Sequence, residues 1–118
     1  MVGTHRDDNY RDILKGIKIK TLVYGSDTLM SEFLLQKNSV LPAHSHPYEQ
    51  TGYLVKGRII LHIGTKKYEM TPGGSWCIPK DAEHKAEILE DSVALEIFSP
   101  AREDYKAHLD KDSLLGPE

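Results

Sequence analysis

The residues that could carry chemistry are concentrated in one short stretch, HSHPYEQTGYLVKG, at positions 44–57. His44 and His46 are two residues apart, a spacing that places both imidazoles on one face of a β-strand. A surface strand gains little from crowding two histidines on one face. Neutral imidazole nitrogen, however, is the commonest protein ligand for first-row divalent metals. The pair therefore predicts part of a metal site.

Two further residues can complete this site. His84 lies 38 residues beyond His46, at the start of a predicted strand and after a Pro-Lys-Asp-Ala corner. Gln50 would add a carbonyl oxygen and is preferred to Glu49, because a shift of one residue turns a strand side chain to the opposite face. Glu49 would then face outward or assist as a bridge. Three imidazoles and one oxygen leave positions free for water or substrate, as in catalytic metal sites. Zinc, nickel, manganese and iron all accept this donor set.

Length and charge narrow the class of protein. A chain of 118 residues is expected to form a single domain over 1–118. A net charge of −3 with both signs interspersed predicts no nucleic-acid partner, and no apolar run approaches the roughly 18 residues of a membrane span. The N-terminus lacks the apolar centre of a secretory signal, which favours a cytoplasmic location. Cys77 is the only cysteine, which excludes an internal disulfide and a thiolate cluster.

Short strand patterns separated by Gly and Pro corners dominate the chain and predict an all-β sandwich or barrel. Gly64-Thr65 has the length of a two-residue hairpin turn. The charged ends, 7–16 and 101–118, are expected to be irregular or to hold short helices. Long apolar strands invite pairing, so we expect a homodimer built from sheet faces or exchanged N-terminal strands. The predicted strands are 17–25, 29–36, 50–55, 58–63, 66–70, 75–79, 84–89 and 93–99.

The spacing of these residues resembles the two sequence motifs of the cupins, G-x5-H-x-H-x3-(E/Q)-x6-G and G-x5-P-x-G-x2-H. The matches span residues 38–57 and 73–84, with Asn38 and Asp81 in place of two glycines; both residue types suit turns, and asparagine tolerates a positive φ. The resemblance is to a small single-domain cupin of the cupin 2 type, and it implies a jelly-roll barrel, the double-stranded β-helix. The residues that match are His44, His46, Gln50, Gly57, Gly73, Pro79 and His84.

The last strand adds three residues suited to substrate chemistry. Glu96 and Phe98 share one strand face, and Arg102 follows the Ser99-Pro100 corner. If that face points inward, a carboxylate that can transfer protons and a guanidinium that can clamp a substrate carboxylate meet near the metal. A structural ion pair between Glu96 and Arg102 is the alternative.

This ending is similar to that of the small cupins of pectin and alginate degradation, which convert cyclic 4,5-unsaturated uronates to linear keto forms. That resemblance implies that His44, His46, His84 and Gln50 hold one divalent metal ion. It implies Glu96 as the proton-transferring acid, where that family has an aspartate. Phe98 would be the aromatic wall of the substrate site, and Arg102 the arginine that binds the substrate.

The function expected from this resemblance is that of a metal-dependent isomerase or hydro-lyase-like enzyme acting on a small acidic sugar. Two other functions stay open: a non-catalytic barrel that binds or stores a metal or ligand, and an iron-dependent dioxygenase. Gln50 disfavours the dioxygenase, because the usual carboxylate ligand is missing. Trp76 and Tyr53 are expected in the core or an interface, with a pocket-lining role open for both, and His62 is expected to be an ordinary strand residue.

Overall fold

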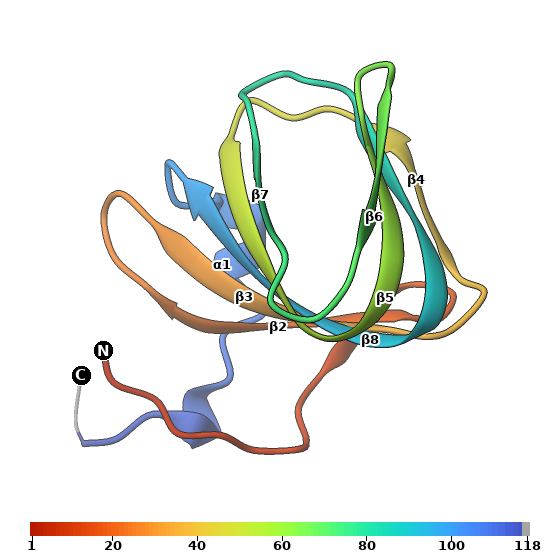
Figure 1. Cartoon of the computed structure of the whole chain (residues 1–118). Coiled ribbons are helices and arrows are strands. Elements are labelled where there is room, and N and C mark those ends of the chain that lie inside the picture. Colours follow the sequence, from red (N-terminus) through yellow and green to blue (C-terminus); the bar gives the residue numbers. More distant parts are fainter. Residues whose placement is uncertain (117–118) are drawn as a thin grey trace.

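The structure is a computed structural model that describes residues 1–116 (Figure 1). Its strands form one antiparallel sheet that curls around a common interior, in the order β1-β2-β3-β8-β5-β6, with β4 paired to β8 and β7 paired to β5. This all-β arrangement agrees with the predicted jelly-roll barrel. The strands are β1 Arg11–Leu14, β2 Ile17–Tyr24, β3 Leu29–Leu35, β4 Val40–His44, β5 Glu49–Ile63, β6 Lys66–Met70, β7 Ser75–Ile78 and β8 His84–Ser99.

β5 and β8 are the two long strands of the sheet, and each joins two segments that the sequence analysis separates by a turn. The predicted breaks at Lys56-Gly57 and at 90–92 are wrong, because both segments stay within continuous strands. The register of β5 against β8 shifts between Leu54 and Ile59, where Gly57 has a φ of +96°. A β-bulge of this kind bends a strand without ending it. The bend lets each long strand pair with different neighbours along its length.

The two motif positions that lack glycine adopt the backbone expected of them. Asn38 and Asp81 have φ values of 71° and 65°, in the region that glycine enters most readily. The two matching motif glycines, Gly57 and Gly73, also have positive φ. The four motif positions therefore share a positive φ although two of them are not glycine.

The two charged ends of the chain differ in structure. Residues 11–14 form β1, which pairs with β2, so a helix in the N-terminal segment is wrong. Pairing with β2 stabilises this segment more than a helix would, because an isolated helix of this length is only marginally stable. The C-terminal segment holds the short helices expected of it, α1 Glu103–Lys106 and η1 Lys111–Ser113. No helix in residues 1–116 is both long and apolar enough to cross a membrane.

The interior is filled by alternate side chains of the sheet. Buried side chains alternate with intermediate ones along the whole of β3. In β8, buried side chains alternate with more exposed ones on both sides of the strand's centre. The inward residues of β8 end with Ala94, Glu96 and Phe98. The predicted shared face of Glu96 and Phe98 is thus the inner one.

The N- and C-terminal segments run side by side below the sheet and are joined to it by a buried ion pair (Figure 1). Lys20 of β2 is only 1% exposed, and its Nζ lies 3.0 Å from Asp110 Oδ2 and 3.0 Å from the carbonyl of Arg6. Asn9 and Ser113 also donate to the Asp110 carboxylate. We refer to Asn9, Lys20, Asp110 and Ser113 as the terminal clasp.

The clasp holds the Asp110 carboxylate in its charged form. Burial would raise the pKa of Asp110, but the hydrogen bonds from Ser113, Asn9 and Lys20 outweigh it and lower the pKa to about 2. The folded pKa is below the unfolded one. The clasp therefore contributes its full stability above about pH 4, and the contribution is lost as the pH falls toward 2.

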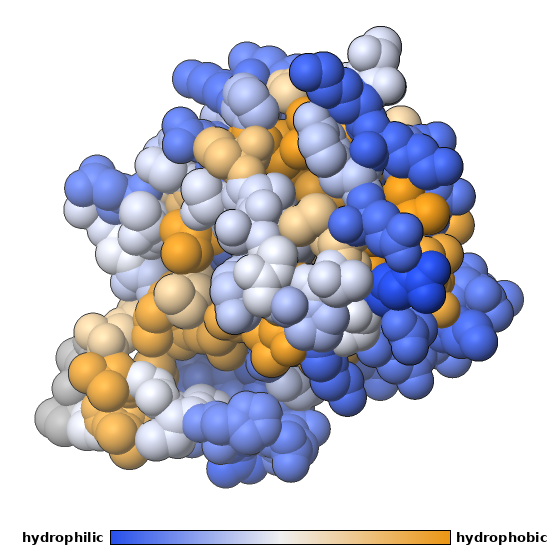
Figure 2. Space-filling model, in the orientation of Figure 1, coloured by the Kyte–Doolittle hydropathy of each residue, from blue (hydrophilic) through white to orange (hydrophobic). Residues whose placement is uncertain are grey.

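The outward face of the sheet carries apolar side chains where β3, β8 and β5 lie together. Met30 pairs with Ile97 and Tyr53 with Leu95 across these strands. Figure 2 also shows hydrophobic residues gathered over the terminal segments at the lower left, where Met1, Val2 and Leu115 are exposed. The homodimer stays a prediction.

Lys20→Met should destabilise the fold by about 3 kcal/mol, because it leaves the buried Asp110 carboxylate without its cation. Lys18→Met, on the same face of β2 but exposed, is the matched control and should change stability by less than about 0.5 kcal/mol. Urea unfolding at pH 7 measures both. Equal effects of the two substitutions would show that the ion pair does not hold the termini.

Candidate metal centre and pocket

Three histidines from separate parts of the chain converge at one end of the interior. His44 ends β4 and pairs in register with His84, the first residue of β8. His46 lies in the loop after β4, so the predicted shared strand face is wrong for this residue. Its backbone carbonyl instead accepts a hydrogen bond from the N–H of Asp81, at 2.9 Å, which ties its loop to the corner before β8.

The three rings are close enough to share an ion. The ring centroid of His84 lies 4.1 Å from that of His44 and 4.9 Å from that of His46, and the remaining pair is 5.6 Å apart. One candidate ligand nitrogen from each ring lies within 4.8 Å of the other two. The sequence prediction that His84 joins the other two histidines is therefore confirmed as a grouping.

Backbone carbonyls determine which nitrogen of each ring is free. A carbonyl oxygen only accepts hydrogen bonds, so an Nδ1 bonded to one carries the ring proton and leaves a lone pair on Nε2. Metal-bound histidines in proteins are oriented in this way. All three Nδ1 atoms face a carbonyl two residues away, those of Pro42, Tyr48 and Ala82, at 2.8, 3.2 and 2.9 Å.

The Nε2 atom of His84 is buried and, within residues 1–116, has no hydrogen-bond partner. The whole residue is 2% exposed, and burial lowers its pKa to about 4, so the ring is neutral at pH 7. Burial also lowers the pKa of His46. A buried polar atom without a partner needs an explanation, and a metal ion would provide one for this lone pair. The residues present therefore fit a metal ion.

Gln50, near the start of β5, presents its amide oxygen to the same cluster. Its Oε1 lies 3.0 Å from Nε2 of His46, and its side chain also faces the Glu96 carboxyl group, whose pKa it lowers. With the His46 proton on Nδ1, these two atoms are both acceptors, and a cation between them would remove the conflict. Glu49 lies on the exposed side, with its Oε1 3.8 Å from the Cys77 Sγ. Gln50, not Glu49, is at the histidines.

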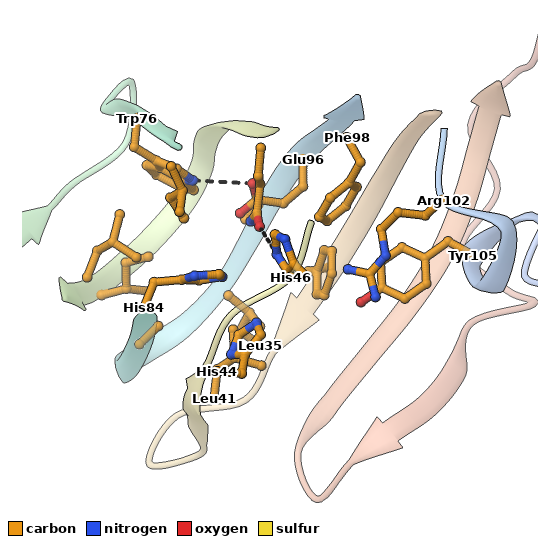
Figure 3. Close-up of a pocket in the computed structure, with 17 residues that line it drawn as sticks. Leu35, Leu41, His44, His46, Trp76, His84, Glu96, Phe98, Arg102 and Tyr105 are labelled. Carbon is orange, nitrogen blue, oxygen red and sulfur yellow. Dashed lines mark hydrogen bonds between the residues drawn. The ribbon is translucent and has the colours of Figure 1, made fainter. Parts of the chain in front are cut away.

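Glu96 lies beside Gln50 in the interior. Trp76 of β7 donates its indole N–H to Glu96 Oε2 at 3.2 Å (Figure 3). Burial raises the pKa of Glu96 to about 8, although the hydrogen bonds from Gln50 and Trp76 act in the opposite direction. The structural ion pair with Arg102 that the sequence left open is not formed. The carboxyl partner of Arg102 is Asp104.

Arg102 lines the pocket just beyond the end of β8. Its Nε and Nη2 donate to the two carboxylate oxygens of Asp104 at 3.1 and 2.7 Å. The guanidinium carbon lies 3.7 Å from the ring centroid of Tyr105, 4.9 Å from that of Phe98 and 5.1 Å from that of Tyr48. The bidentate pair and the stacked aromatic rings fix the guanidinium beside the pocket.

The cluster, Glu96, Phe98 and Arg102 all line one cavity of about 50 Å³ (Figure 3). This volume is enough for an ion and a few waters. Glu96 supplies the only carboxyl group among the described residues that line it. Sequence reasoning missed Tyr48 and Tyr105, and it left open the role of Trp76, which also lines the cavity.

A barrel of antiparallel strands with three histidines grouped at one interior end defines the class of protein. The chain belongs to the cupin family: the family model described as "Cupin domain" matches residues 31–99. The confirmed grouping and the fold both agree with that membership.

Three proteins are similar to the chain over most of its length, and one of them is named a pectin degradation protein. It is 26% identical over 98 residues to the pectin degradation protein KdgF of Dickeya dadantii, which covers 81% of this chain and 89% of that protein. The solved structure of KdgF from Halomonas sp. matches with a TM-score of 0.84 and 26% identity, over 88% of this chain and 96% of that one. An RmlC-like cupin from Shewanella frigidimarina matches with a TM-score of 0.78 and 26% identity, over 81% and 86% of the two chains.

Removal of one histidine from the cluster should abolish stoichiometric metal binding. We expect the purified protein to bind about one divalent ion per chain, and His84→Ala to weaken binding at least 100-fold because it removes a ligand atom. Elemental analysis after dialysis against a metal buffer measures this. The matched control is His62→Ala, since His62 pairs with Glu87 away from the cluster. Equal metal content in the parent and in His84→Ala would contradict the assignment.

Proposed function

We propose that the protein is a metal-dependent isomerase that converts a cyclic 4,5-unsaturated uronate to its linear keto form. The observation that carries the proposal is one cavity lined by three grouped histidines, a single buried carboxyl group and a guanidinium. The relative named as a pectin degradation protein supports a uronate substrate, because pectin is a polymer of uronic acid units.

The reaction needs only the movement of a proton. The hydroxyl on C1 of the sugar loses its proton as the bond between C1 and the ring oxygen breaks, which leaves an aldehyde at C1. The ring oxygen becomes an enolate oxygen on C5. A proton then adds to C4 and the enolate becomes a ketone. One proton leaves and one arrives, so the product is an isomer and no oxidant is consumed.

Glu96 is the group we assign to this proton transfer. It is the only carboxyl group among the described residues of the cavity lining, and it lies beside Gln50 at the histidine cluster. A positioned carboxyl group that donates and accepts a proton accelerates such steps by roughly 100- to 10,000-fold. Phe98 forms an apolar wall next to it on β8.

Arg102 is the group we assign to the substrate carboxylate. Asp104 and Tyr105 hold its guanidinium in one plane beside the cavity, and the planar fork of an arginine matches the geometry of a carboxylate. An acidic sugar has one carboxylate with which to pair, so binding through Arg102 would also set the orientation of the ring.

His44, His46, His84 and Gln50 are the residues that would hold the ion, as their free lone pairs indicate. A bound divalent ion would supply Lewis acidity toward the sugar oxygens. Because all four donors are neutral, the ion would keep its full charge and attract an anionic substrate. The metal could be zinc, nickel, manganese or iron.

Glu96→Gln should reduce turnover of a 4,5-unsaturated uronate at least 100-fold, because the amide cannot exchange a proton with the sugar. Loss of absorbance of the conjugated double bond follows the reaction, and the metal content should stay unchanged. Glu49→Gln, on the exposed side of the same sheet, is the control that should retain full activity. No turnover by the parent protein, over a panel of acidic sugars, would favour a binding or storage barrel instead.

Arg102→Ala should raise KM for acidic sugars by roughly 10- to 100-fold, since a charge-assisted pair with the substrate carboxylate is lost. Steady-state kinetics on a uronate and on its methyl ester separate this effect from general damage. The variant should narrow the difference in KM between the two substrates. Arg58→Ala, which removes an exposed arginine paired with Glu69, is the matched control. An unchanged KM in Arg102→Ala would remove the arginine from substrate binding.

A further inference from the structure

Trp76, Gly52 and Glu96 lie in one row across three neighbouring strands. Gly52 of β5 pairs with Trp76 of β7 on one side and with Glu96 of β8 on the other. Cross-strand partners in a row present their side chains on the same face of the sheet, which here is the cavity side. The central position of the row has no side chain.

The missing side chain of Gly52 is what lets its two neighbours meet. A Cβ at position 52 would lie 2.1 Å from the indole Nε1 of Trp76 and 2.4 Å from Oε2 of Glu96. These are the two atoms that form the hydrogen bond at 3.2 Å, so the bond passes directly above the glycine. Glycine within a strand often marks such a close approach.

A glutamate at position 96 needs this contact more than a shorter acid would. Its carboxyl is on a chain one methylene longer than that of aspartate, and each additional rotatable bond adds freedom that must be restricted. Trp76 holds the carboxyl from β7 (Figure 3), and Gln50 holds it from β5. Both donors act on the same group, and a displacement of about 1 Å at a reacting group can reduce a rate 100-fold.

We propose that Trp76 is a positioning residue for Glu96, that Gly52 provides the space for their contact, and that this arrangement makes the chain require glutamate at position 96. This inference rests on the proposed function, since the carboxyl is positioned for the proton transfer assigned above. Trp76 acts through Glu96 and need not touch the substrate.

The contact itself can be tested without any substrate. Trp76 is the only tryptophan in the chain, so its indole N–H gives a single resonance in a ¹⁵N-labelled sample of the full chain. We expect that resonance to be shifted downfield and protected from solvent exchange, and Glu96→Asp and Glu96→Ala to move it to the same new position. Glu49→Asp should leave it unchanged. A resonance that does not respond to Glu96→Asp overturns the inference, whatever the activity.

The positioning role is tested by kinetics. Trp76→Phe keeps an aromatic ring but removes the N–H, and it should lower kcat roughly 10- to 100-fold while KM stays within about twofold and metal content is unchanged. Glu96→Asp should lower kcat by a similar factor. The double variant should be no slower than the slower single variant, because both changes break the same contact. If the reductions of kcat in the two single variants multiply in the double variant, the two residues act independently and the proposal is overturned.

Gly52→Ala is a second way to break the contact between Trp76 and Glu96. It should lower kcat as Trp76→Phe does, because its methyl group occupies the place of the hydrogen bond. Gly25→Ala is the control, since a Cβ there meets no atom within 4 Å. Full kcat in Trp76→Phe overturns the positioning role while the proposed function stands. No turnover by the parent protein on any unsaturated uronate overturns the proposed function and the positioning role with it.

Discussion

The site depends on how three backbone carbonyls orient three imidazole rings. Each carbonyl is only two residues from its histidine, so the orientation of each ring is set locally, by the end of β4 for His44 and by chain corners for His46 and His84. The convergence of the rings is set at long range, by the register of His44 with His84 and by the hydrogen bond from Asp81 to the carbonyl of His46. Orientation and proximity therefore have separate causes. The barrel brings these segments together, and each segment turns its own lone pair inward.

This division explains which parts could be predicted from the sequence. Corner geometry follows from residue type, so Asn38 and Asp81 were recognised as turn residues and have the positive φ expected. Strand alternation placed Glu96 on the same side as Phe98, and the structure shows that side to be the interior. The breaks in β5 and β8 were predicted wrongly because a bulge and a turn carry the same sequence signal, a glycine or short polar run. Only pairing with neighbouring strands distinguishes them.

The contacts among side chains in the pocket were beyond the reach of sequence reasoning. Because Glu96 and Arg102 are close in the sequence, an ion pair between them is one expectation. In the structure, Arg102 pairs with Asp104 instead, and Glu96 accepts a hydrogen bond from Trp76. Which partner a long side chain takes depends on distances that only the folded sheet determines. One signal was present in the sequence: Gly52, a glycine within a strand pattern, which indicates that something approaches the backbone closely there.

The pocket has two parts that are held in different ways. The histidines, Gln50 and Glu96 are on or next to the strands that form the barrel, whereas Arg102 and Tyr105 are on the segment that follows it. Thr21 of β2 fixes that segment by donating its hydroxyl to the Tyr105 carbonyl at 2.6 Å and its N–H to the His108 carbonyl at 2.9 Å. The terminal clasp secures the same segment a few residues further along. The position of the guanidinium therefore depends on residues that lie outside the cavity, and the binding of an acidic ligand under the proposed function would depend on them too, whereas the histidine cluster is held by the barrel.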